Sequence, residues 1–330
     1  SERRKIGLFC NIAPEDVIIA LDADSIYKIP LQYHEQGLDR QILKHFGMLE
    51  TAPAPDLEKW RHIIDTIGAW EHETTIAVVG KYCGLPDAYK SLNEALFHAG
   101  IAHKTKVRVK WIESDTLETM TPEQVDQAFA GIQGILVPGG FGNRGVEGKM
   151  IAERYAREKK IPFFGICLGM QTAVIEAARH LLGIEDANST EFTKNCTPVV
   201  ALMTEWEQDG KKQIRDENTD VGGTMRLGAY PCKLKSGSLA SKLYDGADVI
   251  HERHRHRYEV SMPVARRLEE KGLIVSGTSP DGLLPEIVEL KDHPFFIAVQ
   301  FHPEFKSRAF QAHPIFKGFI AAALKQNTLI

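Results

Sequence analysis

Short, continuous apolar runs alternate with helical patterns from Thr74 onward, and this alternation is the feature that most limits the fold. The runs TIAVVG (75–80), GILVPGG (134–140) and PFFGI (162–166) have no polar face. Such strands are buried on both sides, which is typical of parallel strands covered by helices on each face of the sheet. We therefore predict an α/β fold with an open, mostly parallel sheet and helices on both faces.

Helices are expected between these strands, and extra strands in the second half. The predicted helices are one capped by Asp87 with Leu92, Leu96 and Ala99 on one face, one after Thr121, one from about Glu147 and one over 314–325. The second half contains PVVALM, TMRLGAY, LIVSGTS and FFIAVQF, which are strand-like. Because strands outnumber helices there, we expect added antiparallel strands.

The composition describes an ordinary globular chain. Of its 330 residues 43% are hydrophobic and 25% charged, with a formal net charge of −4, so neither a nucleic-acid nor a membrane partner is expected. Its five cysteines (Cys10, Cys83, Cys167, Cys196 and Cys232) form no C-x-x-C pair, which argues against a disulfide framework and a zinc site. A cytoplasmic location is the expectation.

Three segments follow one another along the chain. Residues 1–47 have too few periodic elements to close a core alone and look like the edge of another domain. Residues 48–73 contain helix-breaking prolines and a predicted helix over 56–68, so we interpret them as a linker. The strand and helix series occupies 74–330.

Cys167 follows the run PFFGI directly, at the carboxyl end of a predicted strand, where open α/β sheets bind ligands. Gly165 and Gly169 allow a sharp strand-to-helix turn that projects the sulfur, and a helix N-terminus favours the thiolate. A free cysteine is more often a small buried hydrophobe. From this stretch alone, both interpretations stay open.

Two further strand ends supply what a thiol nucleophile needs. In VQFHPEF (299–305), His302 and Glu304 lie on one side of the chain if it is extended, so the carboxylate can orient an imidazole that accepts the Cys167 proton. VPGGFGNRG (137–145) ends in glycines whose N–H groups can approach an oxyanion. A flexible turn or a phosphate loop is the alternative, although no Walker sequence is present.

The run HERHRHRYEV (251–260) also has charged and aromatic side chains. As one strand it places His251, Arg253, Arg255 and Arg257 on one face and His254, His256 and Tyr258 on the other. Arginines among the candidate ligands disfavour a metal ion. A clamp for an anion or carboxylate fits this pattern better.

These motifs resemble a known family. PGGFGNRG, GICLGMQ and FHPEF, in this order, are similar to the class I, triad-type glutamine amidotransferase domain. GKYCGLPDAYKS, DANSTEF, GGTMRLG and RHRHRYEV narrow the resemblance to the CTP synthase family, and residues 1–47 resemble only the end of its N-terminal synthetase domain. The resemblance implies glutamine hydrolysis that supplies ammonia for the ATP-dependent amination of UTP to CTP.

The resemblance also implies roles for individual residues. Cys167 would be the nucleophile, His302 the general base and then acid, and Glu304 the group that orients it. The oxyanion donors and glutamine-binding positions would be Gly140, Phe141, Leu168, Gly169, Met170, Gln171, Glu191 and Arg257. Lys5 and Ala23 fall where the family contacts nucleotide.

In the family, ATP and Mg²⁺ serve the synthetase domain, GTP is an allosteric activator near Arg144 and GGTMRLG, and a homotetramer is expected for the intact enzyme. The glutaminase domain itself is expected to bind no cofactor and no metal. The sequence has no ATP phosphate loop and no Mg²⁺ carboxylates, so we expect glutamine hydrolysis at most, without CTP formation. A fragment of a bifunctional enzyme is the most economical explanation.

Two alternatives from other classes remain. Related folds with a cysteine at the same turn include peptidase and chaperone-like proteins, and the chain could be a catalytically silent regulatory piece. The late His-Pro-Glu and the glutamine-binding positions distinguish the amidotransferase from the first alternative. An intact set of Cys167, His302 and Glu304 argues against the second.

Overall fold

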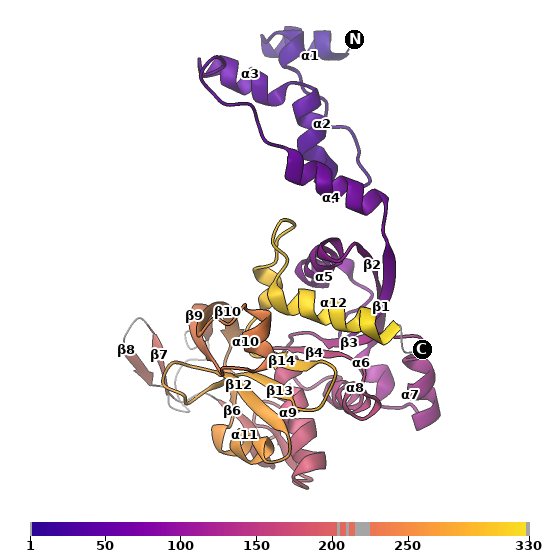
Figure 1. The fold of residues 1–330 in the computed structure, drawn as a ribbon, viewed down its shortest axis with the longest axis vertical. Coiled ribbons are helices and arrows are strands. Elements are labelled where there is room, and N and C mark those ends of the chain that lie inside the picture. Colours follow the sequence, from indigo (N-terminus) through magenta and orange to yellow (C-terminus); the bar gives the residue numbers. More distant parts are fainter. Residues whose placement is uncertain (1, 203–204, 209–210, 215–224, 328–330) are drawn as a thin grey trace. The chain divides into compact units, whose positions relative to one another are not determined.

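The structure is a computed structural model in which residues 2–202, 205–208, 211–214 and 225–327 are described. The chain forms two compact units, Ser1–Glu71 and His72–Ile330 (Figure 1). All described strands belong to the second unit.

The first unit consists of short helices. Its elements are α1 (Glu2–Cys10), η1 (Pro14–Asp16), η2 (Ile26–Lys28), α2 (Ile29–Glu35), α3 (Leu38–His45) and α4 (Glu58–Gly68). Tyr27 packs against Trp60 of α4 with ring centroids 6.4 Å apart. Tyr27 and Ile63 are the buried hydrophobic side chains among its described residues, so this unit buries little apolar surface.

A nine-stranded sheet organises the second unit. Its strands are β1 (His72–Gly80), β2 (Thr105–Glu113), β3 (Gly134–Val137), β4 (Phe163–Ile166), β9 (Arg226–Leu234), β10 (Val249–His256), β12 (Leu273–Thr278), β13 (Pro285–Leu290) and β14 (Phe296–Val299). The order is β10-β9-β12-β13-β14-β4-β3-β1-β2. Strands β14, β4, β3, β1 and β2 are parallel, and the other four pair antiparallel. Both the parallel sheet and the antiparallel extension predicted from the sequence are confirmed.

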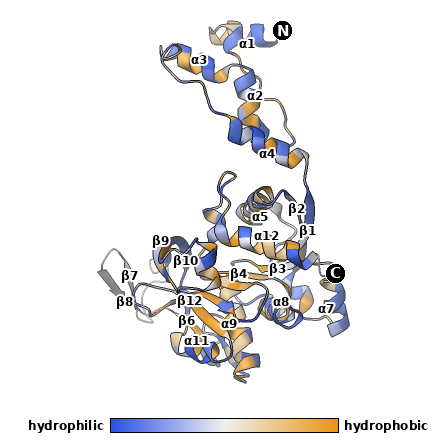
Figure 2. Cartoon of the chain, in the orientation of Figure 1, coloured by the Kyte–Doolittle hydropathy of each residue, from blue (hydrophilic) through white to orange (hydrophobic). Residues whose placement is uncertain are grey.

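Helices cover both faces of this sheet (Figure 1). One face carries α5 (Lys90–Ala102), α10 (Leu239–Leu243) and α12 (Pro314–Asn327), and the other carries α6 (Ser114–Leu117), α7 (Pro122–Ala128), α8 (Val146–Lys159), α9 (Leu168–Leu181) and α11 (Met262–Glu269). Successive strand residues alternate between the two cores: Ile76 and Val78 face one, Ala77 and Val79 the other. Figure 2 shows the corresponding hydrophobic colour on the central strands.

Two smaller sheets lie beside the large one. They are β11-β6-β5, formed by Tyr258–Val260, Thr197–Leu202 and Ala187–Ser189, and the hairpin β7-β8, formed by Glu205–Gln208 and Lys211–Ile214. HERHRHRYEV is therefore not one strand, because it breaks at Arg257 and its two parts join different sheets. The prediction of a single strand was wrong at this point.

The N-cap prediction for α5 was also wrong. Asp87 lies inside the 3-10 turn η3 (Pro86–Tyr89), and Tyr89 directly precedes α5. The predicted buried face of that helix is confirmed, since Leu92, Leu96 and Ala99 are all buried.

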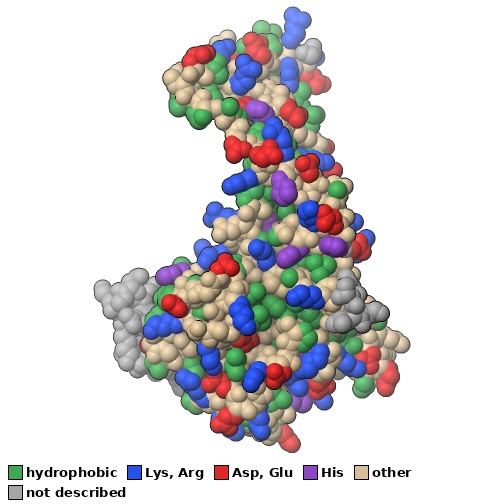
Figure 3. All heavy atoms as spheres, viewed as in Figure 1, with side chains coloured by type: hydrophobic (Ala, Val, Ile, Leu, Met, Phe, Trp, Pro, Cys, Tyr) green, Lys and Arg blue, Asp and Glu red, His purple; other side chains and the backbone are tan. Residues whose placement is uncertain are grey.

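No helix in the described part of the chain is both long enough and apolar enough to cross a bilayer. On the face shown in Figure 3, basic and acidic side chains of the second unit are interspersed.

Candidate active site

Cys167 occupies a strained turn between β4 and α9. Its backbone has φ +52° and ψ −102°, a region that non-glycine residues adopt at a cost of about 1–3 kcal/mol. A Cβ on Gly169 would overlap the carbonyl oxygen of Val137, and one on Gly165 would lie 2.7 Å from the Gly169 carbonyl oxygen. The glycines on both sides are therefore sterically required. Cys167 is 3% exposed, yet it lines two cavities.

His302 and Glu304 are in direct contact. Nδ1 of His302 lies 2.7 Å from Oε1 of Glu304, and the His302 backbone N–H donates to the Arg253 carbonyl of β10 at 2.7 Å. The chain here is not extended as predicted, because Pro303 starts a 3-10 turn, η5 (Pro303–Phe305). The imidazole and the carboxylate are therefore brought together by this turn and not by an extended chain.

The imidazole also lies beside the cysteine. A Cβ on Gly139 would lie 2.8 Å from Cε1 of His302 and 3.5 Å from Cβ of Cys167, so the loop backbone packs against both. Burial alone would lower the pKa of His302, but the Cys167 sulfur and the Glu304 carboxylate outweigh it and raise the pKa to about 10. Nε2 of His302 is buried and has no well-aligned hydrogen-bond partner among the described residues.

Two cavities meet at Cys167. One of about 250 Å³ is lined by His302, Glu304 and Arg255, among others. The second, of about 230 Å³, is lined by Gly140, Phe141, Cys167, Gln171, Glu191, His256, Arg257 and Tyr258. Five of the predicted glutamine or oxyanion positions thus share one cavity with the cysteine.

The remaining predicted positions have other surroundings. Leu168 is adjacent to Gly140, since a Cβ on Gly140 would lie 3.3 Å from its Cδ2. Gly169 packs on β3 and Met170 belongs to the hydrophobic core, so neither lines the two cavities. Lys5 and Ala23 are exposed residues of the first unit.

Gln300 is a site residue that the sequence analysis missed. It is fully buried, and its Nε2 lies 3.7 Å from the Cys167 sulfur. Its Oε1 accepts from Nε2 of Gln171 at 3.0 Å, while that same Gln171 nitrogen donates to the Tyr258 carbonyl at 2.9 Å. A polar residue inside an apolar strand run, directly before FHPEF, was the available signal.

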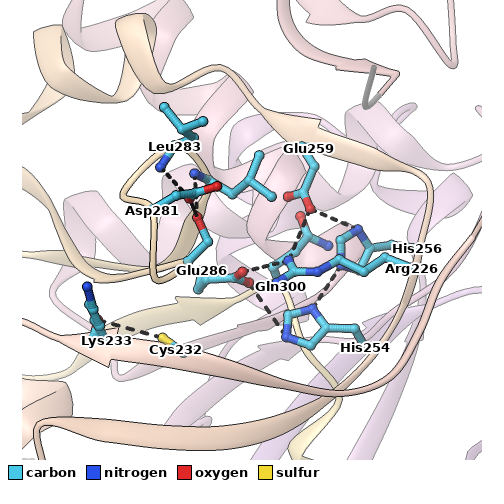
Figure 4. A network of polar contacts seen from close by, with 12 residues as sticks. Arg226, Cys232, Lys233, His254, His256, Glu259, Asp281, Leu283, Glu286 and Gln300 are labelled. Atoms are coloured by element: carbon cyan, nitrogen blue, oxygen red, sulfur yellow. Dashed lines mark hydrogen bonds and ion pairs between the residues drawn. The ribbon is translucent and has the colours of Figure 1, made fainter. Parts of the chain in front are cut away.

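A buried ionic network joins residues of β9, β10, β11 and β13 (Figure 4). Arg226 donates to Glu286 at 2.6 Å and to Glu259 at 3.3 Å, and Nδ1 of His254 lies 2.9 Å from Nε2 of His256. Burial, with the nearby Arg226 charge, holds the pKa of both histidines well below its usual value, so both are neutral.

The exposed face of β10 carries the arginines, as predicted, with alternating exposure from Val249 to His256. Arg255 and Arg257 nevertheless line different cavities, because the strand has ended before Arg257. They do not form one clamp.

The structure describes part of the two segments for which a role in GTP activation is expected from the resemblance. Arg144 lies 3.4 Å from Asp115 and its guanidinium lies over the Tyr82 ring at 4.7 Å. In GGTMRLG, residues 222–224 lie outside the described residues. Within the described ranges, no group of three His, Cys, Asp or Glu side chains could hold a metal ion.

Comparisons with known proteins identify a family for each part of the chain. Residues 84–322 match the family described as glutamine amidotransferase class-I, and residues 1–48 match CTP synthase N-terminus. Proteins named CTP synthase from Novosphingobium aromaticivorans and Zymomonas mobilis are 57% and 55% identical over 329 and 330 residues, which is 100% of this chain and 60% of each relative. The chain thus spans 60% of the length of these relatives.

A solved structure is also similar. The glutaminase domain of Trypanosoma brucei CTPS with bound acivicin is 40% identical, with a TM-score of 0.69 over 76% of this chain and 94% of that domain. Because the amidotransferase match covers more than half of the sequence, the chain belongs to the class-I glutamine amidotransferase family, and over its full length it is similar to CTP synthases.

Proposed function

We propose that the chain hydrolyses glutamine with Cys167 as nucleophile, His302 as proton carrier and Glu304 as its orienting group. The observation that carries this proposal is the cavity in which Cys167 meets the predicted substrate positions, with His302 held 2.7 Å from Glu304 beside it. His302 is proposed to accept the Cys167 proton, and its raised pKa supports an imidazolium that keeps this proton until ammonia leaves.

In the proposed reaction, the Cys167 thiolate attacks the carbon of the glutamine side-chain amide, and a C–S bond forms. The backbone N–H groups of Gly140 and Leu168 donate hydrogen bonds to the developing oxyanion. Leu168 is the first residue of α9, where backbone N–H groups have no partner inside the helix. When the intermediate collapses, the C–N bond breaks and His302 gives its proton to the departing ammonia.

The second half of the reaction releases glutamate. Water attacks the γ-glutamyl thioester, His302 accepts its proton, and the C–S bond breaks to restore the thiolate. Glu304 holds the imidazole through Nδ1 in both halves, which leaves Nε2 to exchange protons with the reacting groups.

Substrate recognition rests on opposite charges around the cavity. Nε of Arg257 is buried and has no partner among the described residues, so a substrate carboxylate would complete its hydrogen bonding. Glu191, anchored by the Gly142 N–H at 2.8 Å, supplies negative charge for an α-ammonium group. This charge pattern and a cavity of about 230 Å³ suit a free amino acid better than the peptide chain of the peptidase alternative.

In the intact enzyme, the proposal continues with ammonia consumed in the amination of UTP to CTP, with ATP and Mg²⁺ bound outside this chain, GTP as activator and a cytoplasmic homotetramer. The similarity to CTP synthases along the whole chain supports it, as does the match of residues 1–48 to their N-terminus. The 330-residue chain alone is expected to form glutamate and no CTP.

Covalent labelling tests the proposal. The chain is incubated with acivicin or a diazoketone analogue of glutamine, and the modified residue is located by peptide mass spectrometry. We expect label on Cys167, absent in Cys167→Ala and unchanged in Cys83→Ala. Burial raises the pKa of Cys83 to about 11 and that of Cys232 well above its usual value, so neither should compete. Label confined to those two thiols would refute the proposal.

A further inference from the structure

Two side chains form hydrogen bonds to the same peptide unit in the loop that follows β3. The carbonyl oxygen of Phe141 accepts a hydrogen bond from Nζ of Lys81 at 2.7 Å. The N–H of Gly142, the other end of the same peptide unit, donates to Oε1 of Glu191 at 2.8 Å. Because a peptide unit is planar, these two contacts together fix its orientation.

The loop needs such restraint because of its composition. Gly139, Gly140 and Gly142 surround Phe141, and Gly142 has φ +74°. Glycine adopts many backbone conformations at similar energy, so peptide units between glycines can rotate at little cost. A rotated Phe141–Gly142 unit would turn a carbonyl oxygen, with its partial negative charge, toward the cavity that Phe141 lines.

Lys81 is itself firmly placed. It directly follows β1 and is only 8% exposed. The Tyr89 hydroxyl accepts from its N–H at 3.1 Å and donates to its carbonyl at 2.6 Å. A buried ammonium needs partners to offset its desolvation, and its described partners are the carbonyl oxygens of Phe141 and, at 3.4 Å, Gly142.

A second cation lies behind the same loop. Lys149 of α8 is 1% exposed, and its Nζ would lie 3.5 Å from a Cβ on Gly140. Two buried lysines from different elements therefore approach the backbone on which the proposed oxyanion donor lies.

We infer that Lys81 is a positioning residue for the oxyanion loop, acting through the Phe141–Gly142 peptide that it shares with Glu191. Lys81 holds the Phe141 carbonyl away from the cavity, which leaves the Gly140 N–H to face the reacting carbonyl. This inference rests on the proposed glutamine hydrolysis, and it adds a residue that contacts neither substrate nor Cys167.

The test compares Lys81→Met, Lys81→Arg and Lys110→Met in the 330-residue chain. Lys110 donates to the Ala128 carbonyl at 2.7 Å on the exposed surface, so its variant removes the same kind of bond elsewhere. We expect Lys81→Met to lower kcat/KM for glutamine about 10- to 100-fold, mainly through kcat, because oxyanion contacts act on the transition state. Lys81→Arg should restore part of the loss, and Lys110→Met should match the wild type.

A second measurement separates positioning from general damage. Alkylation of Cys167 by iodoacetamide needs no oxyanion donor, so its rate should be unchanged in Lys81→Met. The double variant Lys81→Met/Glu191→Gln should lose less than the product of the single losses, because both contacts hold one peptide. Wild-type kcat/KM in Lys81→Met would overturn the inference, as would a parallel fall in alkylation and thermal stability.

A different experimental result would contradict the proposed function. A wild-type chain that neither hydrolyses glutamine nor takes label at Cys167 would overturn that function, and this inference with it. An active wild type with an equally active Lys81→Met variant would overturn the inference alone.

Discussion

Arg257 has a guanidinium nitrogen whose hydrogen bonding is incomplete among the described residues. Its buried Nε lacks a partner among the described residues and it lines the Cys167 cavity. We expect Arg257→Ala to raise KM for glutamine by roughly 10- to 100-fold, since a hydrogen bond to a charged group contributes about 1.5–3 kcal/mol. The change in kcat should be small, because the carboxylate is remote from the bond that breaks.

Steady-state glutaminase kinetics separate the effect on KM from the effect on kcat, with Arg253→Ala as the control. Arg253 is an exposed arginine of β10 that does not line that cavity. A fall in kcat with unchanged KM would contradict the role assigned to Arg257.

His302 should make stability depend on pH in the alkaline range. Its pKa rises from 6.5 to about 10 on folding, so the stabilisation that it contributes is fully present below pH 6.5 and is lost as pH rises through 10. Between these pH values we expect the wild type to lose more unfolding free energy than His302→Gln, by on the order of a few kcal/mol.

Denaturant unfolding at a series of pH values provides the measurement. His293→Gln is the matched control, because burial lowers the pKa of His293 to about 4, outside this window. Equal alkaline slopes in the wild type and His302→Gln would show that the imidazolium is not stabilised in the fold.

At the scale of elements, the contact between α8 and α6 depends on one glycine. A Cβ on Gly148 would overlap the carbonyl oxygen of Ser114. Alanine is the better helix former by about 1 kcal/mol, so helix propensity alone would make Gly148→Ala stabilising. We expect the opposite sign, a loss of about 1–3 kcal/mol or more from overpacking.

Thermal unfolding of Gly148→Ala tests this contact. Gly84→Ala serves for comparison, because a Cβ there would have no heavy atom within 4 Å and the backbone has negative φ. If Gly148→Ala unfolds at or above the wild-type temperature, the two helices are not packed as closely as described.

The sequence correctly predicted the features that are determined by residues close together in the chain. The turn at Cys167 follows from Gly165 and Gly169, and the buried face of α5 follows from its residue spacing. The contact between His302 and Glu304 was predicted for the wrong reason, because Pro303 starts a 3-10 turn where an extended chain was assumed. The break at Arg257 could not be predicted, because β10 pairs with the preceding strand β9 whereas β11 pairs with β6 in a different sheet.

Long-range polar contacts were the least predictable part of the site. Lys81 contacts Phe141 across sixty positions, and Gln300, which directly follows β14, contacts Cys167. The residues next to Lys81 do not indicate its partner, and for Gln300 the local signal was its position directly before FHPEF. These contacts depend on the order of the strands in the sheet, which places β1, β3, β4 and β14 next to one another.

At the scale of the whole molecule, the two units differ in how much apolar surface they bury. The second has two hydrophobic cores, one on each face of its sheet. In the first, Leu8 and Phe9 of α1 are 81% and 88% exposed. Both side chains lie in residues 1–48, the segment that matches the family CTP synthase N-terminus.

Hydrogen exchange can measure this difference directly. Backbone amides resist exchange where opening them requires a core to unfold, so β3, β4 and β14 should be the most protected elements. We expect α1 and α3 to exchange orders of magnitude faster than these strands, at every protein concentration tested. Slow exchange in α1 that appears only at high concentration would show that a second copy covers Leu8 and Phe9. Slow exchange at all concentrations would contradict the weak burial of the first unit.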